Sequence, residues 1–169
     1  EEIHILALFE TPKEAWNLQE IVYRNLPGEN DPDNFGMQII VNAKDEVLGF
    51  NPKMLIGATR LGVDEIVKMI RTLGGVAVAA HIDRESFSLI GQLGFVPDDL
   101  ALDALEISSR LPYREALRRY NSHLPLIQSS DAHRLKEIGQ CCTTLSIDEV
   151  SIGEIRKAFL KQEGRKIVW

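Results

Sequence analysis

Cysteine is scarce in this sequence. The only two, Cys141 and Cys142, are neighbours, and adjacent cysteines rarely form an ordinary disulfide because the backbone between them does not suit its geometry. The sequence therefore argues against a disulfide-stapled secreted scaffold and favours a reducing, cytoplasmic compartment. A thiolate nucleophile would need a cationic neighbour, and the sequence around the pair shows no obvious one.

Long apolar runs, signal-peptide features and an excess of positive charge are also absent. No run approaches the ~18 apolar residues of a membrane span, so we expect no membrane partner. The 19 Lys and Arg residues are outnumbered by 25 Asp and Glu residues, which gives a net charge of −6. The sequence therefore lacks the broad excess of basic residues that would indicate nucleic-acid binding. Neither a glycine-rich phosphate loop nor a G-x-S-x-G nucleophile elbow occurs.

The pattern of the chain is an alternation of strands and helices. With 169 residues, of which 44% are hydrophobic, the chain is long enough for one globular domain with a real core. Such an alternation predicts an α/β fold with parallel strands and crossover helices. The segment 3–9 is expected to be a strand buried on both faces, 27–36 a surface loop and 37–50 a hairpin. The other predicted strands cover 76–80, 101–108, 125–128, 141–147 and 166–169, and the predicted helices cover 12–26, 63–73, 86–93, 112–120 and 151–162.

Polar side chains follow two of these strands. His81 comes directly after 76–80, and Asp131 and His133 follow 125–128. In α/β folds, working residues gather at the carboxyl ends of strands, and residues two apart in an extended chain point the same way. A carboxylate and an imidazole on one side suit zinc, manganese or iron. The alternative is that Asp131 caps a turn and His133 is a solvated loop residue.

Other polar residues near these strands allow two interpretations each. His81 could instead be a buried histidine bonded to a backbone carbonyl. Arg84 is a candidate anion holder, or it forms a surface ion pair with Glu85 or Asp83. His4 lies early in an apolar strand, where a histidine is more often a core residue than a ligand.

Two further groups are set aside on position alone. His123 precedes a strand, which is the wrong end for a site. Asp103 and Glu106 are three apart, so on a strand they face opposite sides and make a poor acid pair.

Taken together, HIL at 4–6, GGVAVAAHIDR at 74–84 and SSDAH at 129–133 resemble the polymerase-and-histidinol-phosphatase (PHP) superfamily, as do LGFVP and DALEIS between them. The resemblance covers nearly the whole chain and is nearest to the small bacterial metal-dependent phosphoesterases. It implies a distorted (β/α)7 barrel with two or three divalent metal ions (Zn, Mn or Fe) at its carboxyl face. It also implies a set of ligands and one phosphate-binding residue. The implied metal ligands are His4, His81, Asp131 and His133, and Arg84 would lie near the phosphate.

The sequence departs from the family pattern ahead of HIL. The family's H-x-H strand, the aspartate and histidine after it and a glutamate ligand have no counterpart in this chain. The chain therefore resembles the carboxyl-terminal two-thirds of a PHP protein, a partial barrel over 1–169 with an inserted helix-plus-hairpin segment at about 10–62. The strand IHILALF is then expected to have an unpaired edge, completed by an N-terminal segment or by self-association.

The resemblance implies metal-dependent hydrolysis of a phosphoester, with activity that needs the missing N-terminal ligands. A small phosphorylated compound or a short nucleotide is the expected substrate. The alternative is a non-catalytic PHP-type metal-binding or regulatory module of a larger protein.

Overall fold

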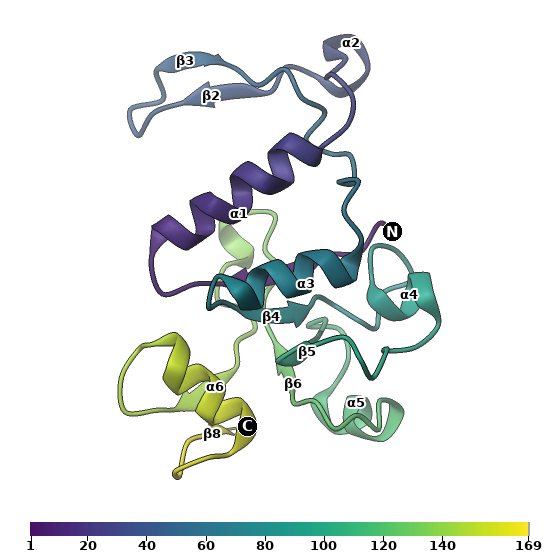
Figure 1. Ribbon diagram of the computed structural model, residues 1–169, viewed down its shortest axis with the longest axis vertical. Coiled ribbons are helices and arrows are strands. Elements are labelled where there is room, and N and C mark those ends of the chain that lie inside the picture. Colours follow the sequence, from purple (N-terminus) through teal and green to yellow (C-terminus); the bar gives the residue numbers. More distant parts are fainter. Residues whose placement is uncertain (169) are drawn as a thin grey trace.

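The computed structural model describes residues 1–168, and a four-stranded sheet in the order β1-β4-β5-β6 lies at its centre (Figure 1). Its strands are β1 (Ile5–Leu8), β4 (Val76–Ala79), β5 (Ala104–Ile107) and β6 (Leu126–Gln128). Strands β4, β5 and β6 are parallel, as predicted, but β1 runs antiparallel to β4, with Ile5 opposite Ala79. The expectation of parallel strands throughout is therefore wrong for β1.

The sheet buries its two central strands completely. Every residue of β4 and β5 is buried. Because successive side chains of a strand point to opposite faces, Ala77 and Ala79 join Val67 and Ile70 of α3 (Val63–Thr72) on one face. Val76 and Val78 pack on the other face against α6 (Ile152–Leu160). The short β-branched and alanine side chains of β4 thus sit between two helical layers.

Strand β1 is less buried than predicted. It lies at the end of the sheet, and its side chains alternate between half-buried and exposed, with Leu6 38% and Leu8 39% exposed. The expectation of burial on both faces is wrong, because Ile5 and Ala7 pack against the hydrophobic core while Leu6 and Leu8, on the opposite face, are exposed. The described residues form an open sheet and do not close a (β/α)7 barrel.

The helices begin where local signals predict. Thr11 caps α1 (Pro12–Asn25), Pro12 takes the first helical position, and Ser151 caps α6 by accepting from the Glu154 amide. The helix expected at 86–93 is shorter than predicted, because Ser88 caps α4 (Leu89–Leu93). The remaining crossover helix is α5 (Tyr113–Arg119).

The segment that the sequence predicts as an insertion lies to one side of the sheet. Figure 1 shows the hairpin of β2 (Ile39–Val41) and β3 (Val47–Phe50) beyond α1, away from the central strands. Its expected surface loop also contains a short helix, α2 (Pro32–Phe35), which Asp31 caps. The extent of this segment as a unit, about 10–62, stays a prediction.

The carboxyl-terminal part pairs β7 (Thr144–Ser146) antiparallel with β8 (Lys166–Val168), and α6 lies between them in the chain. A 3-10 turn at Leu135–Glu137 comes before β7. Cys141 and Cys142 are in the loop ahead of β7 and not on the strand as predicted. Trp169, which the prediction placed on the last strand, lies outside the described residues.

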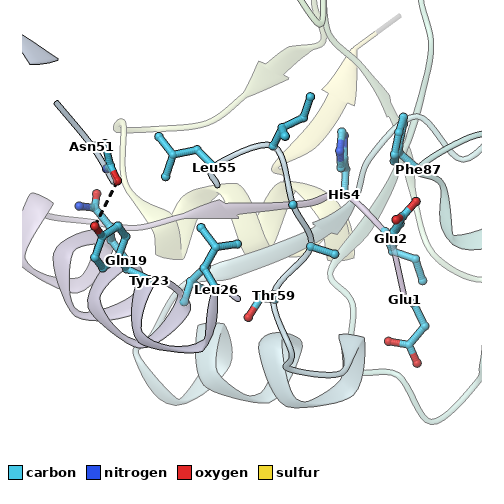
Figure 2. A pocket seen from close by; sticks show the side chains of 15 residues that line it. Glu1, Glu2, His4, Gln19, Tyr23, Leu26, Asn51, Leu55, Thr59 and Phe87 are labelled. Carbon is cyan, nitrogen blue, oxygen red and sulfur yellow. Dashed lines mark hydrogen bonds between the residues drawn. The ribbon is translucent and has the colours of Figure 1, made fainter. Parts of the chain in front are cut away.

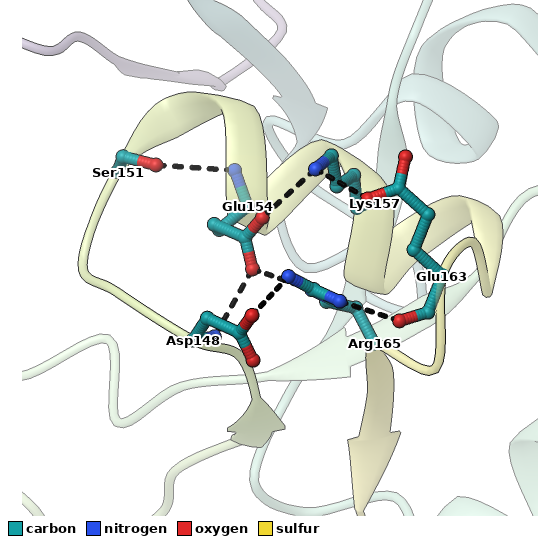
Figure 3. Close-up of polar contacts among 6 residues, drawn as sticks. All are labelled: Asp148, Ser151, Glu154, Lys157, Glu163 and Arg165. Carbon is teal, nitrogen blue, oxygen red and sulfur yellow. Dashed lines mark hydrogen bonds and ion pairs between the residues drawn. The ribbon is translucent and has the colours of Figure 1, made fainter.

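Polar contacts hold this part together (Figure 3). The Glu154 carboxylate accepts from Arg165 Nε at 2.7 Å and from the Asp148 amide at 3.0 Å, and Arg165 also pairs with Asp148. Within residues 1–168, no helix is long and apolar enough to cross a membrane.

Candidate functional site

His4 and His81 meet at the edge where the parallel strands end, called here the carboxyl edge. His81 follows β4 and His4 precedes β1, yet the antiparallel pairing brings the start of β1 to the end of β4. The two ring nitrogens, His4 Nδ1 and His81 Nε2, are 3.2 Å apart. The Ala80 amide donates to the His4 carbonyl, the His4 amide donates to the Phe87 carbonyl, and the His4 ring stacks on Phe87 at 5.2 Å. These contacts fix the His4 backbone and ring.

His81 is buried with one ring nitrogen unused. The residue is 3% exposed and has a φ of +31°, a conformation that non-glycine residues rarely adopt. Its Nδ1 has no hydrogen-bond partner among the described residues, so no backbone carbonyl satisfies the ring as the core interpretation requires. Burial, and then the Arg84 charge, lower the pKa of His81. The ring is therefore held neutral, the form that can donate a lone pair.

Glu106 is the residue that sequence reasoning missed. It lies on β5, 2% exposed, and one carboxylate oxygen accepts from the His81 amide at 3.2 Å. The other oxygen has no partner within residues 1–168, and burial raises the pKa of this carboxyl. A glutamate inside the apolar strand ALEI was the available signal, because a glutamate is rarely fully buried unless it is paired. It forms no pair with Asp103, as predicted, since Asp103 instead accepts from the Ala77 amide and Arg71.

Asp131 contacts the arginine that follows β4. Its Oδ2 lies 2.5 Å from Arg84 Nη2, so Arg84 pairs with Asp131 rather than with Glu85 or Asp83. Strand geometry does not continue to Asp131, because β6 ends at Gln128 and Asp131 has a φ of +46°. His133 consequently does not lie beside the Asp131 carboxylate in an extended chain. The His133 ring is exposed, and its Nδ1 is 2.8 Å from the Asp131 backbone oxygen.

A hollow of about 390 Å³ connects these side chains, and its wall includes His4, His81, Glu106 and Asp131. His133 is not part of that wall. A larger hollow of about 580 Å³ shares Ile3 and His4 with the first. Figure 2 shows His4 and Phe87 at one end of this larger hollow and Gln19, Tyr23 and Asn51 at the other. His4 thus lines both hollows.

The donors at the smaller hollow match the ions that the sequence predicts in type. Two imidazoles and two carboxylates are the ligands that first-row metals use, and His81 Nδ1 and one Glu106 oxygen lack partners. Within the described residues, however, no three His, Cys, Asp or Glu side chains are grouped closely enough to hold an ion. The types of donor atom therefore fit the predicted metal ions, but the described side chains do not form a complete set of ligands around one point. The metal-ligand roles of His4, His81, Asp131 and His133, and the phosphate-binding role of Arg84, stay predictions.

Comparisons with known proteins match both a part of the sequence and the fold. Residues 114–163 match a family model described as PHP-associated, which spans α5 to α6. The fold resembles the lesion-specific endonuclease PfuEndoQ from Pyrococcus furiosus, with a TM-score of 0.68 and 22% identity over 98% of this chain and 38% of that chain.

A second solved structure, of Endonuclease Q in complex with a 27-mer duplex substrate with an abasic lesion at the active site, gives a TM-score of 0.66 at 21% identity over 98% of this chain. The chain spans 38% of the length of each of these two structures. No curated protein matches the chain. The family match and the shared fold confirm the resemblance to the PHP superfamily that the histidine-containing motifs predict.

Proposed function

We propose that the protein hydrolyses a phosphoester with the help of divalent metal ions, and that this chain forms one side of the site. The observation that carries the proposal is the contact between His4 and His81 next to the buried carboxyl of Glu106. Bound divalent ions would supply a hydroxide nucleophile at neutral pH and charge stabilisation at the phosphate. His4, His81, Asp131 and Glu106 are the donors within this chain that would hold them.

Arg84, His81 and Glu106 also have roles that do not depend on which ions bind. Arg84 can turn its guanidinium from Asp131 to two oxygens of a phosphate, because its fork of N–H donors fits either anion. The neutral His81 ring keeps a lone pair free in a buried setting. The hydrogen bond from the His81 amide to the Glu106 carboxylate holds the end of β4 against β5.

A phosphodiester of a nucleic acid is the substrate class that the similarity to endonuclease Q supports. One of those structures holds duplex DNA with an abasic lesion at the active site. This substrate class is wider than the one that the sequence resemblance implies, which is a small phosphorylated compound or a short nucleotide. Cleavage of a nucleic-acid strand and hydrolysis of a small phosphodiester use the same chemistry at phosphorus, so both are measurable on one protein.

The test combines metal analysis with hydrolysis by the purified full-length protein. Inductively coupled plasma mass spectrometry measures bound ions, and bis(p-nitrophenyl) phosphate and an abasic duplex serve as substrates with and without a chelator. We expect hydrolysis that the chelator abolishes and Mn²⁺ or Zn²⁺ restores. Hydrolysis that is unchanged by chelation, or absent with every metal, contradicts the proposal.

The alternative is a metal-binding or regulatory module without turnover. The same experiment separates the two: a module binds metal ions but releases no p-nitrophenol and cleaves no strand.

A further inference from the structure

Three arginines lie on the loops that follow three neighbouring parallel strands. Arg84 follows β4, Arg110 follows β5 and Arg134 follows β6. Because the carboxyl ends of adjacent parallel strands meet at one edge of a sheet, all three belong to the edge that carries His81. The overall net charge of −6 gives no sign of these three arginines at one edge.

Hydrogen bonds and an ion pair hold the three loops to one another. The Asp83 carboxylate accepts from the amide and the hydroxyl of Ser108, both at 2.6 Å, which joins the β4 and β5 loops. Gln128 Nε2 donates to the carbonyls of Ser108 at 3.0 Å and Leu111 at 2.8 Å, which joins β6 to the β5 loop. The Arg84–Asp131 pair joins the β4 and β6 loops. The edge is therefore a connected platform and not three independent loops.

Arg110 and Arg134 are exposed on this platform, and within residues 1–168 neither side chain forms an ion pair at 4 Å or less. Their backbones are fixed, since the Arg110 amide donates to the Ser108 hydroxyl and the Arg134 amide to Glu137. The Glu137 carboxylate is occupied by the amides of His133 and Arg134. Two exposed guanidinium groups thus belong to anchored loops at the carboxyl edge, where an external anion can reach them.

We infer that Arg110 and Arg134 bind the backbone phosphates on either side of the reacting phosphate, so that a polynucleotide strand lies across the carboxyl edge. This inference rests on the proposed function and narrows its substrate to a polyanionic chain. A small phosphoester has no flanking phosphates, so it would leave both arginines unused. Arginine suits this role because its planar donors bind phosphate oxygens in pairs.

The experiment measures binding of a labelled duplex DNA with one abasic lesion to the full-length protein in EDTA, from about 50 to 300 mM salt. Variants are Arg110→Ala and Arg134→Ala. Arg118→Ala is the matched control, because Arg118 is an exposed arginine in the last turn of α5, at the opposite end of that crossover helix. Each test variant is expected to raise Kd about three- to tenfold and to reduce the slope of log K against log salt by about 0.9, the value for one phosphate contact. The control is expected to change neither.

Hydrolysis of bis(p-nitrophenyl) phosphate is measured on the same variants and is expected to stay within about twofold of the parent, since that substrate has no flanking phosphate. An unchanged salt slope in both test variants overturns the inference. An equal loss of DNA affinity in Arg118→Ala also overturns it, because the effect then comes from the overall positive charge and not from these two positions. A parent protein that binds no DNA overturns it as well. Altered slopes without hydrolysis of either substrate contradict the proposed function instead.

Discussion

The imidazoles of His4 and His81 are in contact although the two residues are 77 positions apart in the chain. The antiparallel course of β1 produces this contact, because it places the first residues of one strand beside the last residues of the other. The family resemblance implies that both are ligands, and the geometry brings both to one hollow.

Replacing His81 with alanine in the full-length protein is expected to remove a buried nitrogen donor. Metal affinity and turnover should each fall by at least about tenfold, the lower bound for groups that support a metal site. Isothermal titration with Mn²⁺ or Zn²⁺ and the phosphodiester assay measure the two effects. The control is His123→Ala, an exposed histidine ahead of β6. Equal losses in both variants would show that His81 has no special role.

Glu106→Gln tests the residue that the sequence did not reveal. Glutamine keeps an oxygen that can accept from the His81 amide, so the thermal midpoint should stay within a few degrees of the parent. Metal affinity should fall about 10- to 100-fold because the negative charge is lost. The exposed Glu115→Gln on α5 is the matched control. Unchanged affinity in Glu106→Gln would make Glu106 a structural residue only.

Asp131→Ala is expected to lower turnover at least about 100-fold while the fold persists. The Arg84–Asp131 pair is partly exposed, with 39% and 28% of the two side chains accessible, so its loss should cost no more than about 1 kcal/mol of unfolding free energy. Urea denaturation and the phosphodiester assay give the two numbers, with the exposed Asp99→Ala as control. Full activity with fully retained metal would argue against a ligand role.

Glu154 gives the protein an acid-sensitive contact outside the site (Figure 3). The hydrogen bond from Arg165, followed by that from the Asp148 amide, lowers the pKa of Glu154 from 4.5 to about 2. A lowered pKa means that the stabilisation is complete above pH 4.5 and is lost as the pH falls from 4.5 towards 2. Urea melts across this window should therefore show a smaller pH dependence in Glu154→Gln than in the parent.

Glu149→Gln is the control for that measurement, because Glu149 is exposed and forms no ion pair within the described residues. If the parent and Glu154→Gln lose stability in parallel between pH 4.5 and 2, the contact does not hold in solution.

The free side of β1 predicts association of the 169-residue chain. Leu6 and Leu8 are partly exposed there, and an apolar edge strand pairs readily with another chain. Light scattering after size exclusion should show dimers or larger species, and Leu6→Lys should reduce them. The β2–β3 hairpin also exposes apolar side chains, including Leu48 at 67%. If only Leu48→Lys yields a monomer, the hairpin and not β1 is the contact surface.

Local signals predicted much of the fold. Thr11 with Pro12 and Ser151 mark helix starts within one turn of chain, so the structure confirms α1 and α6 almost to the residue. The runs around Val78 and Leu105 predicted the two buried strands, because length and side-chain type suffice there.

Long-range pairing and backbone conformation were not predictable in the same way. Nothing near His4 indicates that β1 is reversed, since the strand with which it pairs, β4, lies far along the chain. The alternation rule for Asp131 and His133 assumed extended backbone, and the φ of +46° at Asp131 breaks it. Glu106 was compared with Asp103 alone, although burial and the His81 amide decide its environment.

The pairing of β1 with β4 also sets an order of events during synthesis. Strand β1 emerges from the ribosome first, but its partner follows only after the helix α1 and the hairpin have been made. Contacts between residues so distant in the chain form slowly, because a long loop must close before they contribute. In the nascent chain, His4 is therefore without its contact to His81 until β4 has been made.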